Sequence, residues 1–192
     1  MGSTFFALLF RQKYIKRWGL MRNTIEENLV EHSAETAFIA HALAVIGNKY
    51  YGKKYNEERI ALLALYHDAS EIITGDLPTP VKYYSEEMRK SYKKIEASAE
   101  KMLLAKLPED FHDIYGDILS GASVEEKRMV KAADKICALI KCLEEIKGGN
   151  REFANAEEST RLSLVEMNCP EADYFMENFL PAFSETLDEI SF

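Results

Sequence analysis

An adjacent histidine–aspartate pair, His67 and Asp68, is the part of this sequence best suited to chemistry. An apolar stretch at residues 60–66 precedes the pair, so both side chains are expected in apolar surroundings. A buried carboxylate is costly unless it is paired, hydrogen-bonded or bound to a metal. An imidazole beside a carboxylate supplies two of the ligand types that divalent transition metals prefer. The pair alone leaves one alternative, a core histidine beside a hydrogen-bonded carboxylate.

Ligand-type side chains in other helical stretches favour the metal site. His32 lies at the start of one such stretch, and Asp134 lies in the apolar run 129–139. Three helices therefore each bring a histidine or a carboxylate into an apolar context. Glu71 follows His67 by one turn, so both are expected on one face of a continuous helix. There Glu71 would act as a general acid or base beside the metal, its alternative being a solvated surface charge.

The composition is that of an ordinary globular protein. The chain has 192 residues, of which 47% are apolar and 29% charged, enough for one domain with a continuous core. The net charge of −8 argues against a nucleic acid or an anionic membrane as the main partner. The three cysteines lack a disulfide-scaffold spacing and are expected as buried thiols. With no leader and no apolar run near the length of a membrane span, we expect a cytoplasmic protein.

Helical periodicity dominates and predicts an all-α, single-domain protein. Helices are expected over residues 31–46, 60–73, 85–107 and 111–119, from the Ser123 capping box to Gly148, over 152–168, and from 171 onward with a bend near Pro181. Pro78 and Pro80 preclude a regular helix over residues 76–80.

Two helix faces can be assigned from spacing. In the 31–46 helix, the expected core face comprises positions 34, 37, 38, 41, 44 and 45, which makes His41 a core residue, while His112 is expected to be exposed. Aromatic residues repeat at helical spacing near the C-terminus and are interpreted as a core or dimer-contact stripe: Tyr174, Phe175, Phe179 and Phe183.

With these residues in view, the sequence resembles the HD-domain metal-dependent phosphohydrolases. Their H…HD…D signature is matched by His32, His67, Asp68 and Asp134. The likeness is closer still to the bacterial 5′-deoxynucleotidases of the YfbR type and covers nearly the whole chain. The matching blocks are residues 16–23, 31–33, 66–71, 74–83, 141–145 and 187–190, and no motif position departs from the pattern.

The resemblance implies a helical HD-domain bundle that hydrolyses deoxyribonucleoside 5′-monophosphates to deoxynucleoside and phosphate. One domain would span residues 1–192, with core motifs in 17–134 and C-terminal helices at 152–190 that complete the bundle or form a dimer contact. One divalent ion would be bound by His32, His67, Asp68 and Asp134. Two imidazoles and two carboxylates favour cobalt or manganese over magnesium, with zinc and copper as the other candidates. The scarcity of further histidines disfavours a second metal centre.

The resemblance also implies the substrate contacts. Arg17 would hold phosphate oxygens in a bidentate fork, and Trp18 would exclude a ribose 2′-hydroxyl. Glu71 would handle the proton of the attacking water or of the leaving 5′-oxygen, two roles that the sequence does not separate. The substrate-binding set is Arg17, Trp18, His32, Asp68, Asp134 and the loop residues Asp76, Leu77, Pro78 and Thr79, with Asp76 on the 3′-hydroxyl. Without the resemblance, an arginine, a tryptophan and a proline-rich loop here would be read as ordinary structural residues.

Two other functions compete with this interpretation. The first is another HD phosphohydrolase, either a cyclic-nucleotide phosphodiesterase or a nucleoside triphosphate triphosphohydrolase. These need further basic residues or a second metal, and neither is evident in the sequence. The second is a non-catalytic helical binding module with a closed structural metal site. The family further implies a homodimer.

Overall fold

The computed structural model describes residues 2–82 and 84–190, except for the side chain of Thr79. The described residues form helices joined by loops, with one isolated β-bridge between Lys16 and Asn28 and no strand. The prediction of an all-α protein is therefore confirmed. Residue 83, at the end of the 74–83 block, lies outside the described residues.

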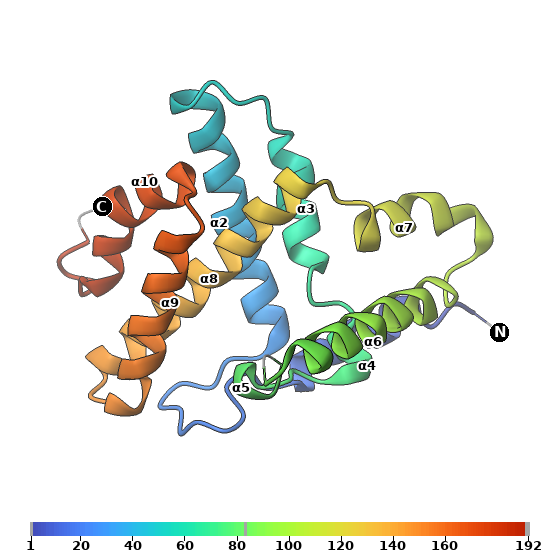
Figure 1. The fold of residues 1–192 in the computed structure, drawn as a ribbon, viewed down its shortest axis with the longest axis horizontal. Coiled ribbons are helices and arrows are strands. Elements are labelled where there is room, and N and C mark those ends of the chain that lie inside the picture. The colour runs from blue at the N-terminus through green and yellow to red at the C-terminus, as the bar shows by residue number, and fades with distance from the viewer. Residues whose placement is uncertain (1, 83, 191–192) are drawn as a thin grey trace.

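The helices follow one another along the whole chain (Figure 1). The α-helices are α1 (Phe5–Leu9), α2 (Leu29–Tyr50), α3 (Glu57–Tyr66), α4 (Glu71–Thr74), α5 (Thr79–Lys82), α6 (Glu86–Leu104), α7 (His112–Ser120), α8 (Val124–Lys147), α9 (Ala154–Glu166) and α10 (Pro170–Asn178). Short 3₁₀ helices are η1 (Phe10–Tyr14), η2 (Glu109–Phe111), η3 (Arg151–Phe153) and η4 (Leu180–Ser184).

The centre of the bundle is formed by α2, α3 and α8, with α9 packed along α8 (Figure 1). Leu43, Leu63, Ile136 and Leu139 are among the buried side chains of this core. Capping boxes start the two longest helices, at Asn28 for α2 and, as predicted, at Ser123 for α8. Such caps stabilise a helix by about 1 kcal/mol each, because they satisfy amides that have no partner within the helix.

A smaller hydrophobic cluster packs the N-terminal helix α1 against α6 and the turn after α3. Phe5 of α1 packs with Leu103 and Leu107 at the end of α6 and with Ala69, which follows the His67–Asp68 pair. Ala69 is only 1% exposed. The packing of α1 and α6 against Ala69 therefore fixes the position of the segment that carries His67 and Asp68.

The predicted continuous helix over residues 60–73 is wrong, and the difference lies at the histidine–aspartate pair. Helix α3 ends at Tyr66, the chain turns through residues 67–70, and α4 begins at Glu71. In this turn the amides of Ala69 and Glu71 bond to carbonyls three residues back, not four. This tighter winding redirects the chain, so Glu71 does not simply follow His67 along one helix face.

The prolines at residues 78 and 80 also act differently from the prediction. A single turn of helix, α5, begins at Thr79 within the segment expected to be non-helical. Pro80 occupies the first turn of this helix, where the missing amide proton costs no intrahelical hydrogen bond. Gly75, at φ 72°, ends α4 in a left-handed conformation that suits glycine, as the predicted stop at this position requires.

The predicted core face of α2 is correct at Ala44, which is fully buried, and at Ala37, which packs against the core, but it is wrong at positions 38 and 41. Phe38 is 74% exposed, and His41 is exposed instead of facing the core. His32 and Thr36 are fully buried, so polar side chains occupy the inward face near the N-terminal end of the helix. The apolar periodicity misleads here because the buried face carries part of a polar site. His112, expected to be exposed, is half-buried, with its Nε2 atom 3.0 Å from the carbonyl oxygen of Leu107.

Helix α2 also differs from the expectation that no apolar run approaches the length of a membrane span. Among the described helices it is the one long and apolar enough to cross a membrane, with a mean hydropathy of 1.2. Half of that window is buried inside the protein, which is typical of the central helix of a bundle. The thiols follow the prediction, since Cys137, Cys142 and Cys169 are all free and buried.

Candidate metal centre and substrate site

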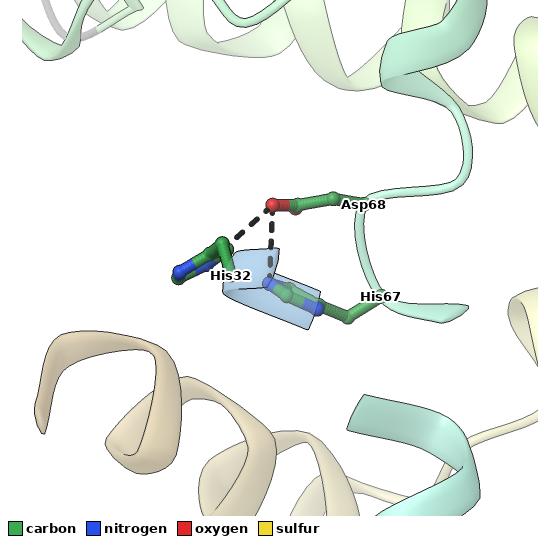
Figure 2. A group of neighbouring side chains, drawn as sticks. All are labelled: His32, His67 and Asp68. Carbon is green, nitrogen blue, oxygen red and sulfur yellow. Dashed lines mark ion pairs between the residues drawn. The ribbon is translucent and has the colours of Figure 1, made fainter. Parts of the chain in front are cut away.

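Three of the predicted ligands converge between α2 and the turn that follows α3. Figure 2 shows Asp68 facing the rings of both His32 and His67. The Oδ2 atom of Asp68 lies 3.2 Å from Nε2 of His67 and 3.8 Å from Nε2 of His32. One potential ligand atom from each residue lies within 4.8 Å of the others. The three side chains are therefore placed to share one cation.

Asp134, the fourth predicted ligand, reaches the same cluster from α8. Its Oδ1 atom is 3.0 Å from Nε2 of His32, the ring nitrogen that also faces Asp68. The side chain of His32 is fully buried, whereas that of Asp134 is 36% exposed. The cluster is thus enclosed on the α2 side and accessible from the Asp134 side.

The hydrogen bonding of His67 fits a metal ligand. Its Nδ1 atom is 2.6 Å from the carbonyl oxygen of Ala64, a contact that requires the proton on Nδ1. In the neutral ring the lone pair is then on Nε2, which is buried and has no hydrogen-bond partner among the described residues. A ring nitrogen left free beside carboxylates, with the other nitrogen bonded to a backbone carbonyl, is the usual arrangement of a metal-binding histidine. The donor set of two imidazoles and two carboxylates fits a divalent transition metal.

Without a cation the two histidines are the groups that hold extra protons, while the two carboxylates stay ionised. Burial disfavours the charged form of His67, but Asp68 and Asp134 outweigh it and raise the pKa of His67 to about 9. Burial also acts against the ionised form of Asp134, but the adjacent His32 and His67 hold the pKa of Asp134 well below its usual range. Metal binding requires neutral imidazoles, so a cation would displace these protons.

Glu71 is a buried carboxyl group with an unused oxygen. The residue is 5% exposed, and its Oε2 atom has no hydrogen-bond partner among the described residues. Burial, together with the charges of Asp68 and Asp76, raises the pKa of Glu71 to about 9. A carboxyl group that stays protonated at neutral pH beside charged groups is a candidate proton donor. It reaches this position from the start of α4 and not from the predicted common helix face.

Arg17 lies at the edge of the cluster. Its Nη1 atom is 3.6 Å from Oδ2 of Asp68, and its Nε atom is 3.4 Å from Oε1 of Glu27. The side chain is only 12% exposed. Burial lowers the pKa of Arg17, but the surrounding carboxylates, Asp134 first among them, outweigh it and keep the guanidinium charged. A fixed cation beside the ligands can hold an anionic group there.

Trp18 is held in a strained backbone conformation next to Arg17. Its φ angle is 57°, a left-handed value that costs a bulky residue roughly 1–2 kcal/mol. The indole Nε1 atom donates a hydrogen bond of 2.7 Å to Oε2 of Glu27. The ring also packs on Phe153, with the ring centroids 5.3 Å apart. Strain of this kind persists only where surrounding contacts compensate for it.

The predicted sugar loop lies between α4 and α5. Asp76 is half-buried, and burial raises its pKa while the nearby charge of Arg17 opposes the rise. Asp76 thus belongs to the electrostatic surroundings of Arg17 and Asp68. Leu77 and Pro78 are half-buried in the same loop. The side chain of Thr79 lies outside the described residues.

Sequence reasoning missed Glu27, which contacts three of the predicted site residues. Its carboxylate meets Trp18 and Arg17, and its Oε1 atom lies 3.3 Å from Nδ1 of His32. Burial raises the pKa of Glu27, but the contacts with His32, Arg17 and Trp18 outweigh it and lower the pKa. No sequence signal separates Glu27 from its neighbour Glu26, whose side chain is 72% exposed.

The fold is that of the HD-domain phosphohydrolases. An HD-domain phosphohydrolase from Listeria innocua superposes with a TM-score of 0.83 at 27% identity, covering 95% of this chain and 90% of that one. The cyanophage S-2L HD phosphohydrolase DatZ, solved with dA and one catalytic Zn²⁺ ion, superposes with a TM-score of 0.66 at 18% identity, covering 94% and 96%. At 18% identity, the likeness to DatZ shows a shared fold and nothing more.

The sequence comparisons narrow the class to one family. The model of the YfbR-like 5′-deoxynucleotidases matches residues 4–183. A 5′-deoxynucleotidase of Vibrio vulnificus is 54% identical over 191 residues, which cover 98% of each chain. The chain belongs to the YfbR-like 5′-deoxynucleotidase family. It is accordingly a metal-binding phosphoric monoester hydrolase, and the predicted family and activity are confirmed.

Proposed function

We propose that the protein hydrolyses deoxyribonucleoside 5′-monophosphates at the cluster around Asp68 and discriminates against ribonucleotides. In this proposal one divalent ion is bound by His32, His67, Asp68 and Asp134. The observation that carries the assignment is the convergence of three ligand atoms within 4.8 Å, with Asp134 3.0 Å from His32. When bound, the ion supplies Lewis acidity and lowers the pKa of water for attack on phosphorus.

Cobalt or manganese is the proposed ion, with zinc and copper as the other candidates. The mixed nitrogen and oxygen donor set supports a transition metal over magnesium, which prefers oxygen ligands and several waters. A single ion is supported by the remaining histidines, because His41 is exposed on α2 and His112 contacts the backbone near α7. Titration of metal-free protein with each ion in a calorimeter measures both the preference and the stoichiometry.

Glu71 is proposed to act as the proton donor to the leaving 5′-oxygen. Its raised pKa supports this role, because a group that is protonated at neutral pH can donate without first binding a proton. A cation at the cluster would lower that pKa and bring it closer to the working pH. The free Oε2 atom also supports the proposal, since no protein group competes for it.

Arg17 is proposed to bind the substrate phosphate. The guanidinium is charged and nearly buried, and it lies 3.6 Å from the ligand Asp68. A phosphate held by this fork would be next to the cation and oriented for in-line attack. Binding of the dianion would also neutralise part of the positive charge that the ion and Arg17 share.

Trp18 and the 76–79 loop are proposed to contact the sugar. Trp18 adjoins Arg17 in the chain, and its indole is held by Glu27 and Phe153, so a rigid ring would border the phosphate site. A rigid ring supports steric exclusion of a 2′-hydroxyl. Asp76 is proposed to bind the 3′-hydroxyl, and Leu77, Pro78 and Thr79 are proposed as further substrate-binding residues. Contacts limited to sugar and phosphate would admit all four bases.

A substrate panel tests the proposal and its alternatives together. Deoxy- and ribonucleoside mono-, di- and triphosphates and cyclic nucleotides are assayed with added cobalt or manganese, and phosphate release is measured. We expect the highest kcat/KM on deoxyribonucleoside 5′-monophosphates. A preference for triphosphates or cyclic nucleotides would assign the chain a different phosphohydrolase activity. No turnover on any member, despite metal binding, would indicate a non-catalytic binding module.

The assembly and the setting of the protein are also proposed. We infer one domain over residues 1–192 that works as a cytoplasmic homodimer, without nucleic acid or membrane as partner. Exposed aromatic rings at the C-terminal end, Phe179 and Phe183, support a contact between subunits, and the buried free thiols support a reducing compartment. The net charge of −8 supports the absence of polyanionic partners. Light scattering coupled to size exclusion tests the dimer, and a monomer at micromolar concentration would refute it.

A further inference from the structure

We propose that Glu27 is a positioning residue that holds His32, Arg17 and Trp18 in one working arrangement. The inference rests on the proposed function of this site and adds a residue that orients its parts. Glu27 touches neither the proposed metal position nor the phosphate through any contact described above. Its effect would be exerted through the three side chains that it contacts.

The carboxylate of Glu27 contacts the side chains of Trp18, His32 and Arg17. The Oε2 atom of Glu27 accepts the 2.7 Å hydrogen bond from the indole of Trp18. The Oε1 atom lies 3.3 Å from Nδ1 of His32 and 3.4 Å from Nε of Arg17. Those two nitrogens are buried and have no hydrogen-bond partner among the described residues, so the carboxylate is their nearest counter-charge. Glu27 is itself 9% exposed, which keeps water from replacing these contacts.

The contact with His32 decides which ring nitrogen is available as a ligand. Nδ1 faces Glu27, while Nε2 faces Asp68 and Asp134. A carboxylate next to Nδ1 favours the tautomer with its proton on that nitrogen, which leaves the Nε2 lone pair directed at the proposed ion. A carboxylate behind a metal-binding imidazole fixes both the tautomer and the ring orientation and raises the basicity of the ligand.

The contacts with Arg17 and Trp18 depend on a short backbone pairing. The amide of Arg17 donates to the carbonyl oxygen of Glu27, and the amide of Leu29 donates to that of Ile15, each at 3.0 Å. This pairing sets Glu27 opposite Arg17 and next to the left-handed turn at Trp18. Because that turn is strained, the hydrogen bond to the indole and the packing on Phe153 are needed to keep the ring in place.

The experiment compares Glu27→Gln and Glu27→Ala with the matched control Glu26→Gln. Glu26 is the adjacent residue, and its exposed side chain pairs only with Lys16 at the surface among the described residues. Metal affinity is measured on metal-free protein by competition of cobalt with a chelator. Acrylamide quenching of fluorescence reports on Trp18, which is the only tryptophan of the chain. Both readouts are independent of turnover.

We expect Glu27→Gln to bind cobalt roughly 10- to 100-fold more weakly, the usual effect of losing the group behind a ligand histidine. We expect Glu27→Ala to make Trp18 more accessible to acrylamide and to lower the ratio of kcat/KM on deoxy- over ribonucleotides. The Glu26→Gln control should match the wild type in every readout.

Two outcomes would overturn the inference. One is a cobalt affinity of Glu27→Gln equal to that of the control, and the other is unchanged quenching of Trp18 in Glu27→Ala. If Glu27→Ala fails to fold, quenching of Trp18 is measured on Glu27→Gln instead. An unchanged cobalt affinity of Glu27→Gln would then be enough to overturn the inference. Failure of the proposed function would look different: the wild type would hydrolyse no deoxynucleotide while the effects on cobalt affinity and quenching persist.

Discussion

A buried ion pair on α8 fastens the loop that carries Arg17, Trp18 and Glu27, and its removal is expected to destabilise the protein strongly. Glu145 is 1% exposed and Lys141 is 5% exposed. The carboxylate of Glu145 accepts hydrogen bonds from the amide of Thr24 at 2.9 Å and the amide of Ile25 at 3.2 Å, while Lys141 donates to Glu145 and to the carbonyl oxygen of Ile25. The side-chain amide of Asn150 also donates a hydrogen bond of 2.8 Å to Oε2 of Glu145.

The expected cost follows from what Glu145→Ala leaves behind. The charge of Lys141 would stay buried without its partner, which costs about 3–5 kcal/mol. The amides of Thr24 and Ile25 would also lose their acceptor, which places the change near the upper end of that range. For a chain of this size each kcal/mol shifts Tm by about 2–4 °C, so a drop of roughly 10–20 °C is expected. In Lys141→Met the carboxylate keeps its other donors, and the cost should be smaller.

Urea unfolding followed by circular dichroism measures these free energies, with Glu144→Ala as the matched control. Glu144 is the neighbouring residue on α8 and is exposed, so its removal should change stability by less than about 0.5 kcal/mol. We expect the order Glu145→Ala, Lys141→Met, Glu144→Ala from largest to smallest loss. A loss below about 1 kcal/mol for Glu145→Ala, or a larger loss for Lys141→Met, would refute the argument that the buried unpaired cation dominates.

Three further predictions concern the site and the effect of pH. Glu71→Ala should lower kcat by roughly 10²- to 10⁴-fold while leaving cobalt affinity unchanged, and full activity in steady-state assays would remove this residue from the mechanism. Trp18→Ala should raise kcat/KM on ribonucleotides relative to deoxynucleotides by roughly tenfold or more, and an unchanged ratio would reject steric exclusion. Burial raises the pKa of Glu145, but its hydrogen bonds from Lys141, Thr24 and Asn150 hold the pKa well below the ordinary 4.5. The stability it contributes is therefore present above about pH 4.5 and is lost as the pH falls, so unfolding of wild type and Glu145→Gln should differ at pH 7 and converge in acid.

Local rules account for the helices that were predicted correctly. The capping box at Ser123, the break at Gly148 and the stop at Gly75 all depend on neighbouring residues, and each is present in the structure. The errors arise where a distant contact outweighs the local pattern. Helix α2 presents His32 and Thr36 to the interior because they face the site, and this turns Phe38 outward against the apolar periodicity.

The break in the predicted 60–73 helix has a similar origin. Nothing in the spacing of apolar residues marks a turn at residues 67–70. Ala69 is buried against Phe5 and Leu103, and the side-chain amide of Gln12 lies 3.5 Å from the carbonyl oxygen of Asp68. These contacts join segments far apart in the chain, so helix propensity within the segment does not reveal them.

The sequence by itself indicated the class of chemistry, because His32, His67, Asp68 and Asp134 match the residue types and order of the HD phosphohydrolase signature. It also determined most helix boundaries, which depend on caps and glycines. Only the tertiary structure decided how the site is held together. Glu26 and Glu27 are identical and adjacent in the sequence, yet the backbone pairing of residues 15–17 with 27–29 exposes the first and buries the second against Arg17, Trp18 and His32. Contacts of that kind depend on where a loop lies in space, which no local pattern encodes.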